Sequence, residues 1–243
     1  MHLTRKAERI LPDMSRLLDE IAELLPPEKV EREQLLVRLV APKALADGWL
    51  VPQVAVFQKA LPGISVRVKT DVKGKQIERD ESIDLAIVTE PITASGLLCE
   101  RLFDDEILPV CTAQYRDLLG LQDLHNWQSV TLLHDKLWEG DWQIWGDHAA
   151  PLGLDWSTGP RYPNHFLACE AAKQALGILM AHHVLVADAL EDQSLVALSR
   201  EPLKTGQSYY LVRRRGHASP AAIQLRAWLL EHLGKAKAFA CSE

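Results

Sequence analysis

The chain has 243 residues, of which 47% are hydrophobic and 25% are charged. This is the composition of an ordinary globular protein with one large or two small domains, and no run reaches the roughly 20 apolar residues that cross a bilayer. The net charge of −6 disfavours independent binding of duplex DNA, because DNA-binding proteins displace counterions with a basic face.

Residues 3–25 have the seven-residue periodicity of a helix that pairs with another helix. The apolar positions of this stripe are Ala7, Ile10, Met14, Leu17, Ile21 and Leu24. Pro12 is expected to kink the helix or to mark its start near residue 13, and Pro26-Pro27 ends it. Two interpretations stay open: the helix pairs with its copy in a second subunit, or it packs on its own core. The charges in MHLTRKAERILPDM interrupt the apolar core that a signal peptide needs, so we expect a cytoplasmic protein.

From residue 35 the pattern changes to short apolar strands that alternate with helices. Leu35–Ala41 is expected as a strand, and Pro42 suits the first turn of a helix that continues through 45–60. Apolar and polar residues alternate over 64–68, which predicts a half-buried strand. The mostly apolar run Asp84–Thr89 predicts another strand. Strands that alternate with helices favour a mainly parallel sheet with right-handed crossovers.

The same alternation returns after Cys111. Helices are expected over 113–119, 142–146, 164–175, 184–190 and 220–233, and strands over 130–133, 178–181, 195–198 and 209–212. Asn164 is suited to cap the helix that follows it, and Gly177 to end that helix. The residues by themselves therefore predict an α/β protein with one or two lobes.

Several sequence segments, in their order and spacing, resemble those of a known protein family. They are WLVPQVAVFQKALPGISVRV, DLAIV and ERLFDDEILPVCTAQY, preceded by LTRKAERILPDMSRLLDEI. Together they resemble the linker helix and effector-binding domain of LysR-type transcriptional regulators over about 3–233. The words LLH and DWQIW, near 132–145, are similar to the branch that contains the glycine-cleavage activator and the β-lactamase inducer.

This resemblance implies a two-lobed, type 2 periplasmic-binding-protein-like α/β domain preceded by a dimerisation linker helix. The implied division places the linker helix and hinge at 1–34, regulatory lobe I at 35–111 plus 209–243, and regulatory lobe II at 112–208. The chain would act as a homodimer or tetramer that modulates transcription when a small metabolite binds in the interlobe cleft. DNA would be bound only through a winged helix-turn-helix, which we expect to be absent from this chain. The alternative is a free-standing solute-binding protein, which the linker helix argues against.

Candidate effector-binding residues follow from the way such sheets bind ligands. Ligands lie at the carboxyl ends of the strands, where helix N-termini offer N–H groups and partial positive charge to an anion. Three such loops can be identified, and the resemblance implies that they face one another across the cleft. The candidates for an anionic or zwitterionic effector are Pro42, Lys43, Ala44, Thr89, Glu90, His134, Asp135, Asn164 and His165. Asn164 and His134 also have structural interpretations, as a helix cap and a hydrogen-bonded histidine.

One of these positions departs from the family's usual pattern. Many members carry Ser or Thr where this chain has Ala44, so a hydroxyl contact to the effector is lost. Backbone N–H groups, or the charge of Lys43, would have to replace it.

No known catalytic motif is found, and an enzyme is not expected. The sequence lacks GxSxG, HExxH, Walker and GxGxxG patterns. His182-His183 could be imagined as a metal pair, but adjacent residues generally cannot both reach one ion. The four cysteines, Cys99, Cys111, Cys169 and Cys241, form no CxxC pair and are expected as free thiols. We therefore predict no metal and no cofactor.

Overall fold

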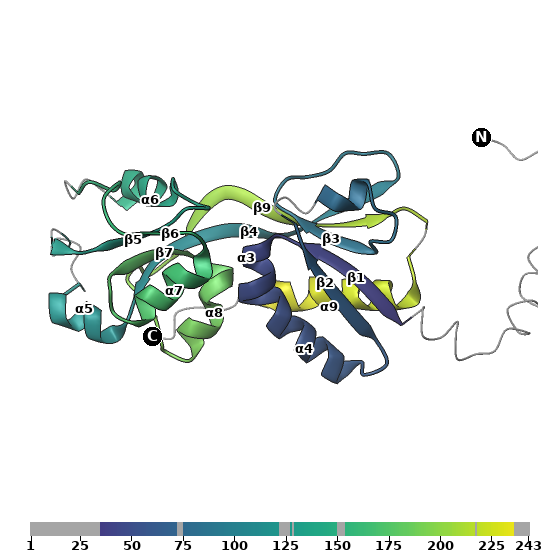
Figure 1. Cartoon of the computed structure of the whole chain (residues 1–243), viewed down its shortest axis with the longest axis horizontal. Coiled ribbons are helices and arrows are strands. Elements are labelled where there is room, and N and C mark those ends of the chain that lie inside the picture. The colour runs from purple at the N-terminus through teal and green to yellow at the C-terminus, as the bar shows by residue number, and fades with distance from the viewer. Residues whose placement is uncertain are drawn as a thin grey trace, which may run out of the picture.

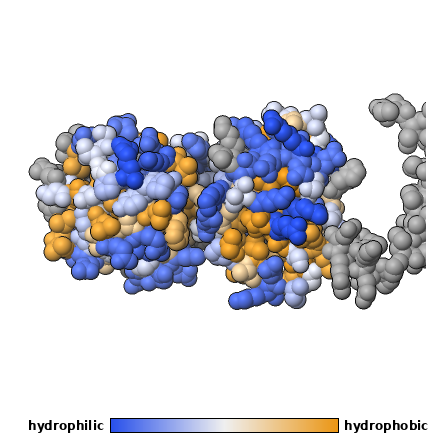
Figure 2. Space-filling model, in the orientation of Figure 1, coloured by the Kyte–Doolittle hydropathy of each residue, from blue (hydrophilic) through white to orange (hydrophobic). Residues whose placement is uncertain are grey.

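The computed structural model describes residues 35–71, 75–121, 127, 129–149, 154–216 and 218–235. The predicted helix of residues 3–25 lies outside the described residues, and so do its pairing positions, Ala7, Ile10, Met14, Leu17, Ile21 and Leu24. Within the described part, the chain forms two bodies joined by two long strands, which we call the first and the second lobe (Figure 1). Figure 2 shows the same two bodies and the narrower waist between them.

The first lobe is a parallel sheet with helices. Its elements are β1 (Leu36–Ala41), α3 (Lys43–Leu45), η1 (Ala46–Leu50), α4 (Val51–Ala60), β2 (Ser65–Thr70), η2 (Lys75–Glu78), β3 (Leu85–Val88) and α9 (Pro220–Lys235). Strand β1 pairs in parallel with both β2 and β3. Alternate residues of β1 face opposite sides: Leu39 packs with Phe57 of α4 and Leu225 of α9, whereas Val40 packs with Ile77 of η2. Because both faces are covered, β3 is apolar throughout its length.

The second lobe repeats this plan around a smaller sheet. Its elements are α5 (Ala113–Leu119), β5 (Leu132–Asp135), α6 (Asp141–Ala149), β6 (Arg161–Tyr162), α7 (His165–Lys173), β7 (Ile178–His182), α8 (His183–Glu191) and β8 (Val196–Ala197). Strand β5 pairs in parallel with β6 and β7. Residues of α7 and α8 form the core on one face of this sheet. The opposite face packs against a tryptophan cluster of Trp127, Trp142, Trp145 and Trp156.

Two long antiparallel strands join the lobes. They are β4 (Leu97–Cys111) and β9 (Leu203–Arg214), and their pairing shifts register between Arg101 and Phe103 and again between Asp104 and Glu106. Strand β9 pairs with β3 of the first lobe, and β4 pairs with β7 and β8 of the second. The result is one sheet in the order β2-β1-β3-β9-β4-β7-β5-β6 that runs through both lobes.

Several element boundaries differ from those expected. The first long helix begins at Lys43 and contains a π-helical turn, η1, before α4. Strand β9 is much longer than the expected 209–212, because its polar first half pairs with β4 and leaves few apolar residues to reveal it.

Gly177 does not end helix α7 as expected. Ala175 takes the left-handed conformation there, with φ of 55°. Gly177 instead lies against β5: a Cβ on it would come within 2.3 Å of the carbonyl oxygen of Thr131. The glycine is required for a close approach of two backbones rather than for a turn.

Candidate functional site

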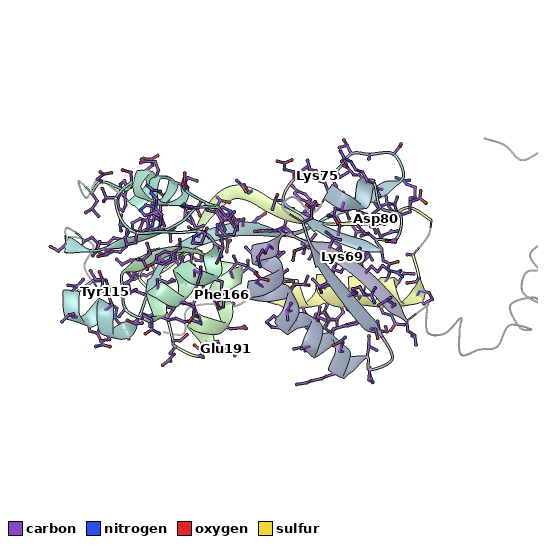
Figure 3. The ribbon with its side chains drawn as sticks, viewed as in Figure 1. Lys69, Lys75, Asp80, Tyr115, Phe166 and Glu191 are labelled. Carbon is purple, nitrogen blue, oxygen red and sulfur yellow. The ribbon has the colours of Figure 1, made fainter. Side chains whose placement is uncertain are left out.

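A cavity of about 260 Å³ lies between the two lobes. From the first lobe its wall includes residues of α3, η1 and α4, and from the second lobe residues of α7 and α8. The lining residues are Lys43, Ala44, Asp47, Gly48, Pro52, Leu137, Asn164, His165, Phe166, Cys169, Glu170, Lys173, Leu185, Asp188 and Ala189. Figure 3 shows Phe166 on the edge of the second lobe that faces α3. The cavity thus brings Lys43 and Ala44 together with Asn164 and His165, the arrangement that the family resemblance implied; their role in binding an effector stays a prediction.

The N-terminus of α7 forms one end of this wall. The side-chain oxygen of Asn164 accepts a hydrogen bond from the backbone N–H of Leu167 at 3.0 Å, which is the arrangement of an N-cap. The structural interpretation of Asn164 is therefore confirmed. The amides of His165 and Phe166 precede the first intrahelical bond of α7, made by Ala168 to Asn164, so helix geometry gives them no partner within the helix.

His165 supplies the most unusual polar group in the wall. The residue is 5% exposed, and its Nδ1 lies 3.6 Å from Oδ2 of Asp135, which is too long for a hydrogen bond. Neither ring nitrogen has a hydrogen-bond partner among the described residues. Burial lowers the pKa of His165 and outweighs the opposing influence of Asp135, so the ring is neutral at pH 7. His165 therefore contributes a neutral imidazole to the wall, and its ring nitrogens are shielded from solvent in this arrangement.

The charges around the cavity have both signs. Lys43 Nζ forms an ion pair with Asp47 Oδ2 at 2.6 Å, within one turn of helix. Lys173 Nζ lies 3.4 Å from Glu170 Oε1, and the carboxylate of Asp188 is on the same wall. Each lysine already has a carboxylate partner, so the wall is not a simple anion-binding site. It offers hydrogen-bond donors and acceptors to a ligand together.

The remaining predicted residues do not line this cavity. Thr89 and Glu90 follow β3, and Glu90 forms an ion pair with Lys75 at 2.8 Å. His134 is buried, with Nε2 2.7 Å from the carbonyl oxygen of Thr158, as its structural interpretation predicts. Pro42 is the N-cap residue of α3 and lies next to the lining residues. Asp135 contacts the cavity through two lining residues: its Oδ2 lies near His165, and its Oδ1 accepts a hydrogen bond from Leu137 N at 2.8 Å.

Sequence reasoning missed the contribution of α8 and η1 to the wall. Leu185 and Asp188 come from α8, and Gly48 comes from the π-helical turn. Their spacing within each segment is ordinary for a helix, so no local pattern distinguishes them. Cys169, also on the wall, is a free thiol whose pKa is raised by burial.

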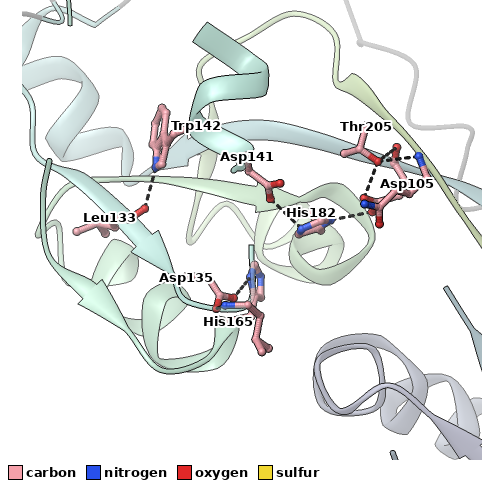
Figure 4. Close-up of polar contacts among 10 residues, drawn as sticks. Asp105, Leu133, Asp135, Asp141, Trp142, His165, His182 and Thr205 are labelled. Carbon is pink, nitrogen blue, oxygen red and sulfur yellow. Dashed lines mark hydrogen bonds and ion pairs between the residues drawn. The ribbon is translucent and has the colours of Figure 1, made fainter. Parts of the chain in front are cut away.

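Within the described ranges, no group of three or more His, Cys, Asp and Glu side chains is arranged to hold a metal ion. His182 contacts Asp105 and Asp141 instead of pairing with His183 toward an ion (Figure 4). The helices of the described part include none that is long and apolar enough to cross a bilayer.

Comparison with known proteins identifies the family. The LysR substrate binding domain matches residues 31–234. The HTH-type transcriptional regulator DsdC of Escherichia coli K12 is 30% identical over 241 residues, which cover 96% of this chain and 77% of DsdC. The glycine cleavage system transcriptional activator of the same strain is 25% identical over 232 residues, covering 94% of this chain and 75% of the activator.

The fold agrees with a solved structure of the same kind. The effector domain of the transcriptional regulator AmpR of Pseudomonas aeruginosa superposes with a TM-score of 0.64 at 24% identity, covering 83% of this chain and 97% of that domain. The chain therefore belongs to the LysR family of transcriptional regulators and contains its substrate-binding domain. The resemblance and the fold class predicted from the sequence are confirmed, and the relatives are regulators rather than enzymes.

Proposed function

We propose that this chain is the effector-sensing part of a LysR-type regulator and that it binds a small zwitterionic or anionic metabolite in the interlobe cavity. The observation that supports this most strongly is the cavity itself, whose wall takes residues from both lobes and includes the buried His165 without a hydrogen-bond partner for its ring nitrogens. A buried polar group without a partner costs free energy unless a ligand or water satisfies it. The lining charges of both signs favour a zwitterion over a simple anion.

A ligand in this position would contact both lobes at once. Lys43, Ala44 and Gly48 belong to the first lobe, and Asn164 and His165 belong to the second. A ligand that binds both walls stabilises the arrangement in which they face each other, and only that differential affinity can shift the population of lobe arrangements. We propose that this shift is the signal passed on to transcription.

We propose further that the chain acts as a homodimer or tetramer in the cytoplasm, and that it is not an enzyme. Self-association would use the heptad helix of residues 3–25, and DNA would be contacted through a winged helix-turn-helix. The division into 1–34, 35–111 plus 209–243, and 112–208 remains a prediction. Packing of Ile107 and Val110 with second-lobe residues favours a first boundary a few residues before 111.

The alternative of a free-standing solute-binding protein has less support. The matched relatives are transcriptional regulators, and the match extends over 96% of this chain in DsdC. The two functions share a fold, so the distinction rests on these relatives and on the predicted pairing helix.

The test is a thermal-shift screen of amino acids, organic acids and cell-wall peptides against the whole chain. A ligand present at one hundred times its Kd should stabilise the folded state by about 2.7 kcal/mol. Ala44→Trp would fill the cavity and should abolish the shift that the best compound causes. Ala55→Trp, on the exposed face of α4, is the matched control and should leave the shift intact. Unchanged affinity in Ala44→Trp would show that the ligand binds elsewhere.

A further inference from the structure

The two strands that join the lobes are irregular at one point. Asp104 pairs with Ser208 and Glu106 pairs with Lys204, so the segment of β9 between these partners is longer than the single β4 residue opposite it. That β4 residue is Asp105. Thr205 and Gly206 lie in the longer segment, where Gly206 has a φ of 81°. This irregular segment is the junction at which the shared sheet passes from the first lobe to the second.

A buried cluster of charges occupies the junction (Figure 4). His182 is 1% exposed, Asp105 is 3% exposed and Asp141 is 7% exposed. Nδ1 of His182 lies 2.7 Å from Oδ1 of Asp105, and its Nε2 lies 3.0 Å from Oδ2 of Asp141. Nδ1 of His182 is hydrogen bonded with Asp105, whereas Nε2 and Oδ2 of Asp141 form a close ion pair without the geometry of a hydrogen bond. Two flanking carboxylates favour the imidazolium form of the ring, because its positive charge faces both of them.

Each member of the cluster comes from a different element. Asp105 belongs to β4, His182 is the last residue of β7 and the N-cap of α8, and Asp141 is the first residue of α6. The hydroxyl of Thr205 on β9 donates to Oδ2 of Asp105 at 2.9 Å. The cluster therefore ties both joining strands to two helices of the second lobe.

Several other titratable or aromatic groups surround His182. From the segment after β5, the ring of Trp138 lies 3.9 Å from the His182 ring, centroid to centroid, and also contacts His165 at 5.8 Å. His165, on α7, is neutral, and Asp135 of β5 lies beside it. On β9, burial and the two carboxylates raise the pKa of Tyr209, which stays protonated.

One further pair lies beside the cluster. His183 of α8 is 3.9 Å from Glu106 of β4, and burial lowers the pKa of His183. None of these groups places a second positive charge on the carboxylates of Asp105 and Asp141. The imidazolium of His182 is thus the cation that compensates both.

We propose that Asp105, His182 and Asp141 form a charged clasp that fixes the second lobe on the joining strands, and that His182 is thereby a positioning residue for the interlobe cavity. The connection to the cavity is α8, which starts at the clasp and contributes Leu185 and Asp188 to the wall. The proposal concerns the placement of the lobes and does not depend on which ligand the cavity binds.

The clasp is sensitive to pH in one direction. Burial alone lowers the pKa of His182, but its interactions with Asp105 and then Asp141 overcome this and raise the pKa to about 9. When the ring loses its proton, one of its nitrogens can no longer donate, and the two buried carboxylates lose the positive charge that compensates them. The clasp is therefore closed at neutral pH and opens as pH rises through about 9.

The first test is a titration of the histidine Cε1–H resonances by NMR in the whole chain. One resonance should have its midpoint near pH 9, more than two units above an ordinary histidine. It should disappear in His182→Gln and its midpoint should fall in Asp141→Asn. A midpoint for His182 near 6.5 would overturn the proposal.

The second test measures lobe placement and needs no ligand. Spin labels introduced as non-natural amino acids at Ala55 on α4 and Gln174 after α7, both exposed, report the interlobe distance. The unmutated protein should give one narrow distance distribution at pH 6.5 that broadens as pH rises to 9.5. His182→Gln should be broad at both pH values, whereas His148→Gln, which changes an exposed histidine of α6, should behave as the unmutated protein.

These measurements separate positioning from mere folding. Far-UV circular dichroism confirms that each sample is folded. Thr205→Val provides a milder change that removes the hydroxyl which donates to Asp105 and accepts from the backbone N–H of Gln207. It should lower the midpoint of the pH-dependent broadening. A distance distribution that is the same at pH 6.5 and 9.5 in the unmutated protein would show that the clasp does not position the lobes.

Discussion

Gly48 of η1 lies directly against Leu185 of α8, so the two lobes touch beside the cavity. A Cβ on Gly48 would come within 3.3 Å of Leu185 Cδ2 and 3.5 Å of its backbone oxygen. Leu185 is 7% exposed and packs into the core of the first lobe, although it belongs to the second. The closeness of the lobes therefore depends on the absence of a side chain at position 48.

Substitution at this contact should separate the lobes. Gly48→Leu places a branched side chain where a single methyl already fits tightly, and we expect a loss of about 1–3 kcal/mol in the free energy of unfolding, together with weaker ligand binding. Urea unfolding and ligand titration measure the two effects. Gly63→Leu, at a glycine with open space around it, should change stability by less than about 0.5 kcal/mol. Equal effects of the two substitutions would contradict the role of this contact.

The clasp should contribute to stability in a pH-dependent way. His182→Leu leaves two buried carboxylates without a cation, and we expect it to cost about 3–5 kcal/mol at pH 6.5. The folded-state pKa of His182 is raised to about 9 from the ordinary 6.5. The stabilisation is therefore fully present below about pH 6.5 and is lost as pH rises through about 9.

Denaturant unfolding at several pH values measures this effect. The difference between the unmutated protein and His182→Leu should shrink between pH 6.5 and 9.5. A difference that grows over this range would mean that His182 is neutral in the folded protein.

Asn164 should have two separable effects. Asn164→Ala removes the cap of α7 and should cost about 1 kcal/mol of stability. Thr112→Ala removes the equivalent cap of α5, where Thr112 Oγ1 accepts from Tyr115 N at 3.2 Å, and should cost a similar amount. Only Asn164→Ala should also weaken binding of the ligand that the thermal-shift screen identifies, because α7 lines the cavity and α5 does not. If both variants bind the ligand as the unmutated protein does, α7 takes no part in the site.

The heptad helix should cause self-association. Leu17→Glu with Leu24→Glu places charges in the predicted seam, and sedimentation should show the oligomer replaced by a monomer whose circular dichroism retains the α/β signal. Glu8→Gln with Asp19→Asn, away from the apolar stripe, is the control. A monomer in the unmutated protein at high concentration would contradict the predicted seam.

Local sequence was sufficient for most of the elements and for the family. The apolar run of β3 and the Asn164 cap are decided by neighbouring residues, and both were predicted within a residue or two. The same holds for the apolar stripe of α4, because a helix that buries one face must repeat its apolar residues with the period of its backbone. In α9 the spacing of Ile223, Ala227 and Leu230 indicates the wrong face: Ile223 is 52% exposed, and the buried residues are Ala221, Ala222, Leu225 and Leu229. The order of these elements also identified the LysR resemblance.

Only the tertiary structure decided which residues meet between and within the lobes. Asp105 and His182 are separated by 77 positions in the chain, and Gly48 touches Leu185 across a still longer interval. The sequence around a carboxylate such as that of Asp105 looks the same whether the side chain is exposed to solvent or contacts a buried imidazolium. Its protonation and its role depend on burial and on partners, and these exist only after β4 and β9 have brought the two lobes together.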